Sequence, residues 1–347
     1  MKKNILLVDD SALMRRTICD IINAESDFQV ADSCCDGVEA YEKLKQEKYD
    51  AVLLDVNMPR MDGLELLEKL QKEHIKATVI MVSTLTTRDA KVTLRAMELG
   101  AIDFVPKPQN IIETKGGKFR SYLLNVLRAA LQEKKPAVIK SVPRRQTPKM
   151  QGIRRNKVVA LACSTGGPKA LQSVIPFLDP KMDAPVLVVQ HMPAGFTRTM
   201  AERLNELSPL EVKEAEDGDI LEKGKVYIAP GGWHLLVKKL ASGGHRVSLS
   251  DAPAIGGLRP CANLMYESLA ACGYDEITCV VLTGMGADGT LGITNLSKKV
   301  PVYVVAQDEA TSVVYGMPRT IYEAGMVDTV VPLDQVAESI LKNVGVN

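Results

Sequence analysis

The chain has 347 residues, too long for one ordinary domain of roughly 100 to 200 residues. Its 43 basic and 42 acidic residues give a formal net charge of +1, so overall charge does not favour binding to nucleic acid or to an anionic membrane. Hydrophobic residues make up 46% of the chain, and no apolar run reaches the ~18 residues of a membrane span. We therefore expect a globular protein with no nucleic-acid partner and no membrane insertion.

The N-terminal stretch MKKNILLVDD has a short apolar run that ends in two aspartates, which predicts a first strand rather than a signal peptide. The seven cysteines are odd in number and lack metal-ligand spacing. This usage predicts reduced thiols and a cytoplasmic location.

Residues 1–134 alternate between apolar runs and amphipathic stretches. The apolar runs are NILLVDD, FQVADSC, YDAVLLDV, TVIMVST and AIDFVPKP, each followed by a helical pattern. Five strand and helix units in a row predict a doubly wound, five-stranded parallel sheet of the flavodoxin-like type. In such a sheet the functional site lies at the carboxyl ends of the strands.

Residues 135–155 interrupt this rhythm with prolines and basic residues and without a single acid. They predict an extended, solvated linker. An RNA- or DNA-binding arm is the weaker interpretation, because the stretch lacks aromatic residues and helical spacing.

Residues 156–347 resume the alternation with KVVALACS, APVLVVQH, EITCVVLT, PVYVVAQ and MVDTVVPL. Between them, KVYIAPGGWHLLVKK and HRVSLSD flank a Ser-Gly-Gly turn and predict an antiparallel hairpin. We expect a three-layer α/β/α domain with a mostly parallel sheet and an antiparallel insertion.

Polar residues end the strands of the first domain. Asp9 and Asp10 follow the first strand, Asp55 the third, Ser83 the fourth and Lys107 the fifth. These strand ends converge in a doubly wound sheet. Clustered carboxylates beside a lysine suit a hard cation such as Mg²⁺ and an anion brought to it.

The stretches VDDSALMRR, LLDVNMPRMDG, MVST and DFVPKP resemble the response-regulator receiver domain over about 120 residues. The resemblance implies that Asp55 is the phosphoacceptor and that a histidine kinase is the phosphodonor. It also implies that Mg²⁺ is bound by Asp10, Asp55 and the backbone carbonyl of Asn57, with Asp9 close by.

The same resemblance implies that Ser83 and Phe104 form a switch pair and that Lys107 contacts the phosphoryl group. A phosphoryl group on Asp55 adds about 1.5 to 2 negative charges. Ser83 and Lys107 can turn toward that charge, and the rotation of Ser83 leaves room for Phe104 to move inward.

In the second domain, the stretch ACSTGGP places Ser164 at a strand end, before Gly166 and Gly167 and a helix that opens at Pro168. A hydroxyl at the positive end of a helix suits a nucleophile or an anion cradle. Capping of the helix by Ser164 or Thr165 is the alternative at this point.

His191 ends the next strand, where its imidazole can serve Ser164 as a general base. His234, in the hairpin, is its strongest rival. Asp288 follows a third strand and can orient the imidazole, while Asp308 is the alternative acid. The order Ser, His, Asp and the lack of a G-x-S-x-G motif argue against the α/β-hydrolase family.

Glycines flank Met285 in the loop TGMGADG. They allow the backbone to bend so that the Met285 N–H faces an oxyanion.

The stretches CSTGGP, VQHMPAGFTRTMAERLN, VYIAPGGWHL, LTGMGADG and AQDEATSVVYGMPR resemble the catalytic domain of the chemotaxis protein-glutamate methylesterase family. The resemblance implies a triad of Ser164, His191 and Asp288, with Thr165 and Met285 in the site. It implies a phosphorylation-activated esterase that demethylates glutamyl methyl esters on methyl-accepting chemotaxis receptors and deamidates receptor glutamines. No cofactor is expected for ester hydrolysis.

The sequence departs from the family pattern in two places. Cys261, Ala262 and Asn263 stand where an RPSVD-like run is expected, and Cys163 stands where alanine is common. Adjacent strand residues face opposite ways, so we expect Cys163 to point into the packing.

Two other classes fit the sequence less well. A DNA-binding response regulator requires a compact helical module with a basic recognition helix, which residues 156–347 do not show. A nucleotide-binding module requires a G-x-G-x-x-G or G-x-x-x-x-G-K-[ST] pattern, which is absent from the STGGP tip.

Overall fold

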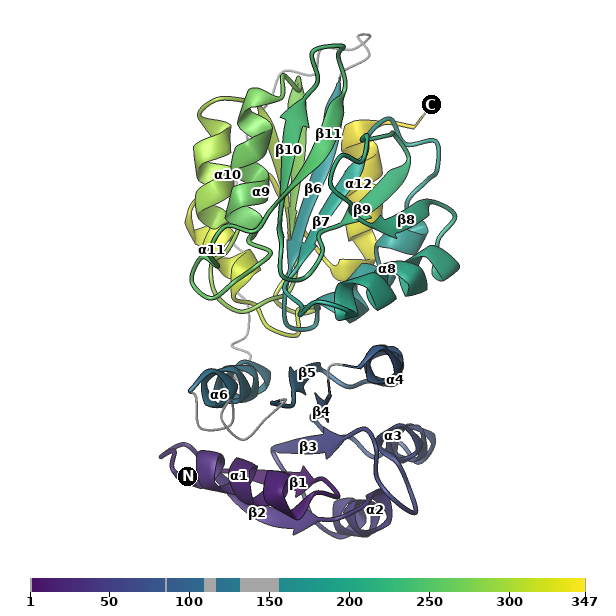
Figure 1. The fold of residues 1–347 in the computed structure, drawn as a ribbon, viewed down its shortest axis with the longest axis vertical. Helices are drawn as coiled ribbons and strands as arrows, with labels where there is room; N and C mark the ends of the chain where they lie inside the picture. Colours follow the sequence, from purple (N-terminus) through teal and green to yellow (C-terminus); the bar gives the residue numbers. More distant parts are fainter. Residues whose placement is uncertain (1, 85, 109–116, 132–155, 347) are drawn as a thin grey trace. The chain divides into compact units, whose positions relative to one another are not determined.

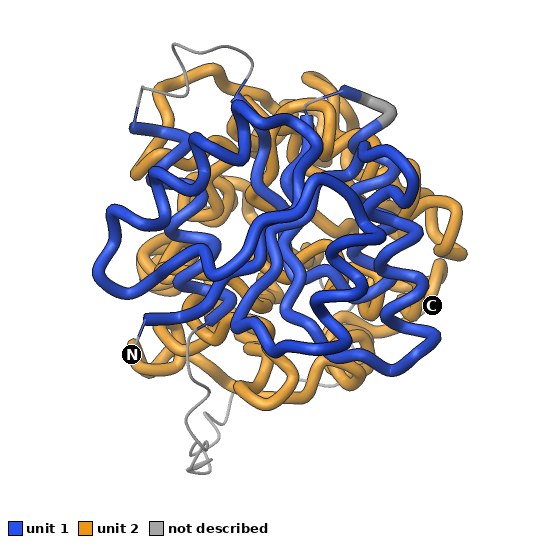
Figure 2. Tube along the Cα trace, turned by 90° about the horizontal axis from the view of Figure 1, so that it is seen from below, with its two compact units in different colours: residues 1–133 blue, residues 134–347 orange. Residues whose placement is uncertain are grey.

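The computed structural model describes residues 2–84, 86–108, 117–131 and 156–346. The chain divides into two compact units, residues 1–133 and 134–347 (Figure 2). The linker predicted at 135–155 lies outside the described residues. Within the described ranges, no helix is both long enough and apolar enough to cross a membrane.

The first unit is a five-stranded parallel sheet in the order β2-β1-β3-β4-β5 (Figure 1), which confirms the predicted doubly wound fold. Its strands are β1 (Lys3–Val8), β2 (Phe28–Cys34), β3 (Ala51–Asp55), β4 (Val79–Ser83) and β5 (Asp103–Pro106). Its helices are α1 (Ala12–Asn23), α2 (Gly37–Gln46), α3 (Gly63–Lys72), α4 (Thr87–Glu98) and α6 (Lys118–Ala130).

Local sequence explains where these elements begin. The central strands β3 and β4 are buried along their whole length, as expected for strands covered on both faces. Asp62 starts α3 with a capping box to Glu65. A Cβ on Gly63 would lie 2.2 Å from the Asp55 carbonyl oxygen, so glycine is required for α3 to start this close to the end of β3.

The second unit contains a seven-stranded parallel sheet in the order β14-β13-β12-β6-β7-β9-β8 (Figure 1). Its strands are β6 (Lys157–Cys163), β7 (Val186–Gln190), β8 (Glu211–Glu214), β9 (Lys225–Ile228), β12 (Glu276–Val281), β13 (Val302–Gln307) and β14 (Thr329–Val331). Its α-helices are α7 (Gly167–Gln172), α8 (Phe196–Leu207), α9 (Ala262–Ser268), α10 (Thr290–Ser297), α11 (Met317–Glu323) and α12 (Val336–Val344). Short 3₁₀ turns are η1 (Ile175–Phe177), η2 (Leu269–Ala271) and η3 (Leu333–Gln335).

The antiparallel insertion is the hairpin of β10 (His234–Lys239) and β11 (His245–Ser250), which confirms the predicted fold class. The stretch KVYI was expected to belong to this hairpin, but it forms β9 and pairs in parallel with β7 and β8 of the main sheet. The edge strand β8 was not predicted, because its sequence EVKE is short and charged.

Helices cover both faces of this sheet (Figure 1). One face packs with α9, α10, α11 and the hairpin in a single apolar cluster. The helices α8 and α12 lie on the other face (Figure 1). The strands β7, β6 and β12 are neighbours and are buried throughout, so their carboxyl ends form a rigid edge for a site.

Candidate active site

Ser164 directly follows β6, the strand between β7 and β12. Its backbone N–H donates to the Thr283 carbonyl at 3.0 Å, and its carbonyl accepts from the Gly167 N–H at 2.7 Å. These bonds fix the backbone on both sides of the hydroxyl. The serine is therefore held at the carboxyl edge of the sheet, as its sequence position predicted.

Glycines make room around this serine. A Cβ on Gly284 would lie 2.8 Å from the Ser164 Cβ, so a larger residue would press on the serine. Gly166 has φ +76°, a left-handed conformation that favours glycine. Gly166 is also the N-cap of α7, and no side chain caps that helix. The hydroxyls of Ser164 and Thr165 thus do not serve as its cap.

The imidazole of His191 contacts Asp288, with 2.8 Å between Nε2 and Oδ2. His191 follows β7, whereas Asp288 follows β12, on the other side of β6. The two side chains therefore meet across the end of the strand that carries Ser164. The backbone N–H of His191 donates to the Cys163 carbonyl at 3.2 Å, which joins the backbone of His191 to the strand end directly before Ser164.

The Asp288 carboxylate accepts several further hydrogen bonds. The donors are the backbone N–H groups of Ala262 (2.6 Å), Asn263 (3.0 Å) and Gly289 (3.0 Å), and the thiol of Cys261 (3.2 Å). Burial alone would raise the pKa of Asp288, but His191 and the N–H groups at the start of α9 lower it to about 2.

The charge on Asp288 determines which nitrogen of the His191 ring carries the proton. An ionised carboxylate only accepts hydrogen bonds, so Nε2 of His191 carries the proton in this pair. The other ring nitrogen, Nδ1, is then the atom that can take up a proton.

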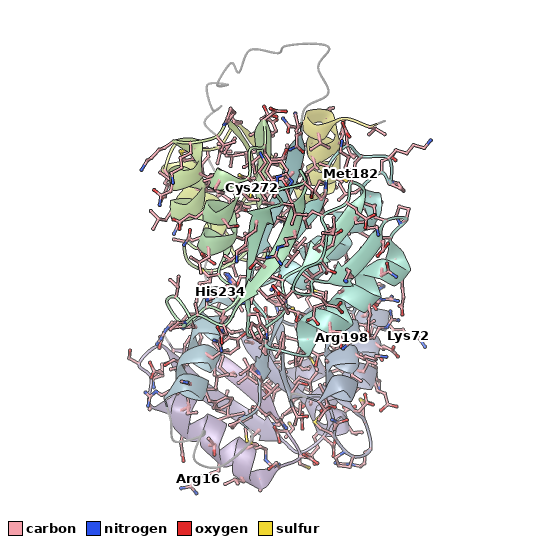
Figure 3. All side chains as sticks on the ribbon, turned by 45° about the horizontal axis from the view of Figure 1, so that its top comes forward. Arg16, Lys72, Met182, Arg198, His234 and Cys272 are labelled. Atoms are coloured by element: carbon pink, nitrogen blue, oxygen red, sulfur yellow. The ribbon has the colours of Figure 1, made fainter. Side chains whose placement is uncertain are left out.

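The two alternatives from the sequence lie elsewhere. Figure 3 shows His234 at the start of β10, and its Nε2 lies 3.3 Å from the Pro253 carbonyl. The Asp308 carboxylate accepts from the backbone N–H and hydroxyl of Thr311 at 2.9 and 2.5 Å. Among the described residues, neither side chain forms a hydrogen bond or ion pair with His191 or Asp288.

Thr165 and Met285 lie on the two loops beside Ser164. The Thr165 carbonyl accepts from the Thr283 hydroxyl at 2.9 Å, and Met285 is 41% exposed. Within the described ranges, the backbone N–H groups of Thr165 and Met285 donate no hydrogen bond to another residue. Both are therefore free to bind an anionic oxygen.

Cys163 is fully buried and its thiol contacts Oε1 of Gln190 at 3.0 Å. Burial raises the pKa of this thiol well above its usual range, so it stays protonated at neutral pH. It is thus packed in the interior, as expected from strand alternation.

Sequence reasoning missed Gln190 and the role of Asn263. The Asn263 Oδ1 accepts from the backbone N–H groups of Gly289 at 3.0 Å and Gly292 at 2.7 Å, where α10 begins. The departure at 261–263 therefore supports the Asp288 loop through both Cys261 and Asn263. The departure of residues 261–263 from the family pattern was the available signal for Asn263.

In the first unit, the strand ends bring Asp9, Asp10 and Asp55 together, with one oxygen from each lying within 4.8 Å of the others. Asp9 and Asp55 are buried and Asp10 is exposed. The Lys107 Nζ lies 2.8 Å from Asp9 Oδ2 and 2.7 Å from Asp55 Oδ2.

The electrostatics of this cluster follow from its burial. Burial raises the pKa of Asp55 to about 6, against the lowering effect of the nearby Lys107. Burial alone would lower the pKa of Lys107, but Asp55 and Asp9 together raise it. Oxygen ligands from buried carboxylates are the donor set that Mg²⁺ prefers, so the residues present fit this ion.

The other predicted receiver residues lie at the end of β4, in β5 and just after β3. The Ser83 hydroxyl donates to the Thr84 carbonyl at 3.2 Å and accepts from the Thr93 hydroxyl at 3.0 Å. Phe104 is buried, with 2% of its surface exposed. The Asn57 side chain donates to Asp89 at 2.9 Å, so its carboxamide is engaged with α4.

The fold and these two groups of side chains define the class of protein: a receiver-type unit with an aspartate cluster, joined to an α/β unit with a candidate Ser, His and Asp site. The family model described as response regulator receiver domain matches residues 5–115, and the one described as CheB methylesterase matches residues 159–340. The chain belongs to the CheB methylesterase family, with a receiver domain preceding the catalytic domain.

Similar proteins span nearly the whole chain. A protein-glutamate methylesterase/protein-glutamine glutaminase of Pyrococcus horikoshii is 40% identical, covering 99% of this chain and 94% of that protein. Its counterpart from Geobacillus kaustophilus is 41% identical and covers 98% of each. The crystal structure of the Thermotoga maritima CheB methylesterase catalytic domain matches with 40% identity and a TM-score of 0.52, over 55% of this chain and 99% of that chain.

Proposed function

We propose that this protein hydrolyses glutamyl methyl esters on methyl-accepting chemotaxis receptors, releasing methanol, and deamidates receptor glutamines. Phosphorylation of its receiver domain activates it. The observation that carries the proposal is the His191 and Asp288 pair, which lies across the strand end that presents Ser164. The names of the two relatives and the catalytic-domain match support the reaction.

In this mechanism Ser164 Oγ attacks the ester carbonyl carbon while Nδ1 of His191 takes the hydroxyl proton. Asp288 holds the ring in the tautomer that leaves Nδ1 free and stabilises the imidazolium that forms. The carbon–oxygen bond to the methoxy group then breaks, and His191 passes its proton to the departing methanol.

The negative charge that develops on the ester oxygen needs fixed donors. The backbone N–H groups of Thr165 and Met285 supply them, one from each loop beside the serine. Water activated by His191 then hydrolyses the acyl-enzyme and releases the receptor glutamate. A glutamine side chain follows the same path, with ammonia in place of methanol.

The receiver residues perform the switch. The Asp55 carboxylate attacks the phosphorus of a phosphohistidine, and the phosphorus–nitrogen bond of the donor breaks. The carboxylates of Asp9, Asp10 and Asp55 and the Asn57 carbonyl would hold Mg²⁺, which offsets the charge on the transferred group when bound. Lys107 then moves its contact from the Asp55 carboxylate to the phosphoryl oxygens.

The partners are part of this proposal. A chemotaxis histidine kinase is the phosphodonor, because the receiver domain requires one. Methyl-accepting chemotaxis receptors are the substrates, because they carry the glutamyl esters that the proposed reaction consumes. A cytoplasmic location belongs to the same proposal, since the phosphohistidine donor is made from ATP.

The test is methanol release from methyl-labelled receptor membranes, with and without a small phosphodonor and Mg²⁺. Ser164→Ala should abolish release under both conditions. Asp55→Asn should keep basal release and lose the stimulation by the phosphodonor. Release that persists in Ser164→Ala would refute the assignment of the nucleophile, and stimulation that persists in Asp55→Asn would refute that of the switch.

A further inference from the structure

The carboxamide of Gln190 connects the two backbone segments that carry the proposed nucleophile and base. Its Nε2 donates to the Ser164 carbonyl at 3.0 Å and to the His191 carbonyl at 3.2 Å. Its Oε1 accepts from the Cys163 thiol at 3.0 Å. One side chain therefore contacts both residues on which the chemistry depends.

The surroundings leave this carboxamide a single orientation. Gln190 is 2% exposed, so water cannot substitute for its partners. Rotation of the amide by 180° would place Oε1 against two carbonyl oxygens, and both bonds to these carbonyls would be lost. The carbonyls of Ser164 and His191 only accept hydrogen bonds, so they select the orientation in which Nε2 faces them.

The start of α7 lies against the same carboxamide. A Cβ on Gly167 would lie 1.8 Å from Gln190 Oε1, so α7 can begin here only with glycine at that position. In the sheet register, Gln190 is the partner of Cys163, the residue before the serine. The carboxamide thus fills the space between the end of β7 and the start of α7.

We propose that Gln190 is a positioning residue that fixes the Ser164 backbone relative to the His191 backbone and so sets the approach of the hydroxyl to Nδ1. This inference rests on the proposed function. The backbone bond from His191 N–H to the Cys163 carbonyl ends one residue before Ser164. The Gly167 N–H also donates to the Ser164 carbonyl, but it belongs to the same loop and does not join the serine to the segment after β7. Gln190 makes that connection, because its Nε2 donates to both carbonyls.

The expected effect lies in the chemical step. A misplacement of about 1 Å between reacting groups can cost about 10²-fold in rate. Gln190→Met keeps the length of the side chain and removes its donors. It should lower kcat about 10- to 100-fold and leave KM within about twofold of the wild type, because no contact with the substrate is removed.

Two further variants probe the same contact differently. Gln190→Glu is isosteric, leaves no cavity, and when ionised donates to neither carbonyl, so kcat should fall at least as far as in Gln190→Met. Gly167→Ala leaves Gln190 in place but pushes its carboxamide away. It should lower kcat by a similar factor.

The matched control is Thr278→Val in β12. Thr278 is fully buried, and its hydroxyl donates to Asn343 Oδ1 at 2.5 Å, remote from the site residues in the sheet. This variant should lower Tm and keep kcat. The kcat values are compared at equal folded fraction, measured by circular dichroism. This comparison separates an effect on the position of Ser164 from an effect on the stability of the fold.

The measurements are kcat and KM for methanol release from methyl-labelled receptor membranes, and the rate of Ser164 labelling by a fluorophosphonate. We expect both kcat and the labelling rate to fall in the Gln190 variants. Labelling at the wild-type rate, a rise in KM at constant kcat, or a kcat that follows only the folded fraction would overturn the positioning role. Absence of release and of labelling in the wild type would instead refute the proposed function.

Discussion

His191 Nε2 and Asp288 Oδ2 lie 2.8 Å apart, although the two residues follow strands on opposite sides of β6. The contact joins the segments that follow β7 and β12 across the end of the strand that carries Ser164, where the proposed mechanism requires the imidazole. It also fixes the tautomer, because a carboxylate with a pKa of about 2 is ionised throughout the neutral range.

The first prediction concerns this tautomer. In Asp288→Asn, the amide N–H can donate to Nε2, which favours the ring form with the proton on Nδ1 and removes the base. The corresponding change in a serine protease triad lowers kcat about 10⁴-fold, and we expect a loss of about 10³- to 10⁴-fold here. Methanol release at saturating receptor measures it.

Asp308→Asn is the matched control for this prediction. Its carboxylate accepts from the backbone N–H and hydroxyl of Thr311 and forms no hydrogen bond or ion pair with His191 among the described residues. We expect kcat within about twofold of the wild type, since no group near the ester changes. Equal losses in Asp308→Asn and Asp288→Asn would contradict the assignment of the acid.

The second prediction concerns Cys261, whose thiol donates to Asp288 Oδ1 at 3.2 Å. Burial and the charge of Asp288 raise the pKa of this thiol to about 11, so it remains a donor at neutral pH. Cys261→Ser keeps a donor and should retain kcat within about twofold. Cys261→Val removes it and should lower kcat about fivefold, the equivalent of a hydrogen bond of about 1 kcal/mol. Methanol release from the two variants, measured side by side, checks this, and equal kcat values would show that the thiol does not support Asp288.

Most of the fold was predictable from the sequence, because buried parallel strands are near-continuous apolar runs. The runs ending at Val8, Asp55 and Cys163 all form strands where expected. The strand β8 was not predictable by this criterion. It is an edge strand, Glu211–Glu214, and its charged side chains interrupt the apolar run.

The positions of the site residues were predictable for a related reason. Parallel strands end at one edge, so Ser164, His191 and Asp55 were candidates by position alone. The sequence could not reveal Gln190, because its function depends on the orientation of one carboxamide between two strand ends. Nor could strand position decide between Asp288 and Asp308, which both follow strands.

The third prediction tests Asn263, whose Oδ1 accepts from Gly289 and Gly292 at the start of α10. Asn263→Ala leaves these N–H groups unpaired, and loss of such a cap costs about 1 to 2 kcal/mol of stability. We expect a lower Tm of the catalytic domain by calorimetry. Asn263→Asp keeps an acceptor oxygen and should restore most of the stability, and an equal loss of Tm in both variants would refute the capping role.

The fourth prediction follows from Asp55, whose pKa is raised from 3.8 to about 6 in the folded protein. Between these values the folded state holds a proton that the unfolded state has lost. The contribution of Asp55 to stability is therefore present below about pH 4 and is lost as the pH rises through about 6. A difference of about 2 pKa units corresponds to at most about 3 kcal/mol.

Urea unfolding of the receiver domain at several pH values measures this loss. Asp55→Asn cannot titrate, so the stability of the wild type relative to this variant should fall between about pH 4 and 6 and then stay constant. A difference that does not change with pH would show that Asp55 keeps its ordinary pKa.

The last prediction concerns the receiver switch. The Ser83 hydroxyl accepts from Thr93 at 3.0 Å and donates to the Thr84 carbonyl at 3.2 Å, and both Ser83 and Thr93 are fully buried. To donate to a phosphoryl group on Asp55, Ser83 must leave this arrangement. Thr93→Val removes one of the two bonds without changing the side-chain volume much. The free-energy cost of turning Ser83 toward Asp55 should therefore fall by about 1 kcal/mol.

A free-energy change of this size corresponds to a shift of about fivefold in the equilibrium of the switch. The phosphodonor concentration that gives half-maximal methanol release should therefore fall about fivefold in Thr93→Val. Thr93→Ser keeps the hydroxyl and should respond like the wild type, whereas Ser83→Ala should lose most of the stimulation. If Thr93→Val requires more phosphodonor instead of less, the Thr93 bond stabilises the active state, and the expected rotation of Ser83 away from Thr93 is wrong.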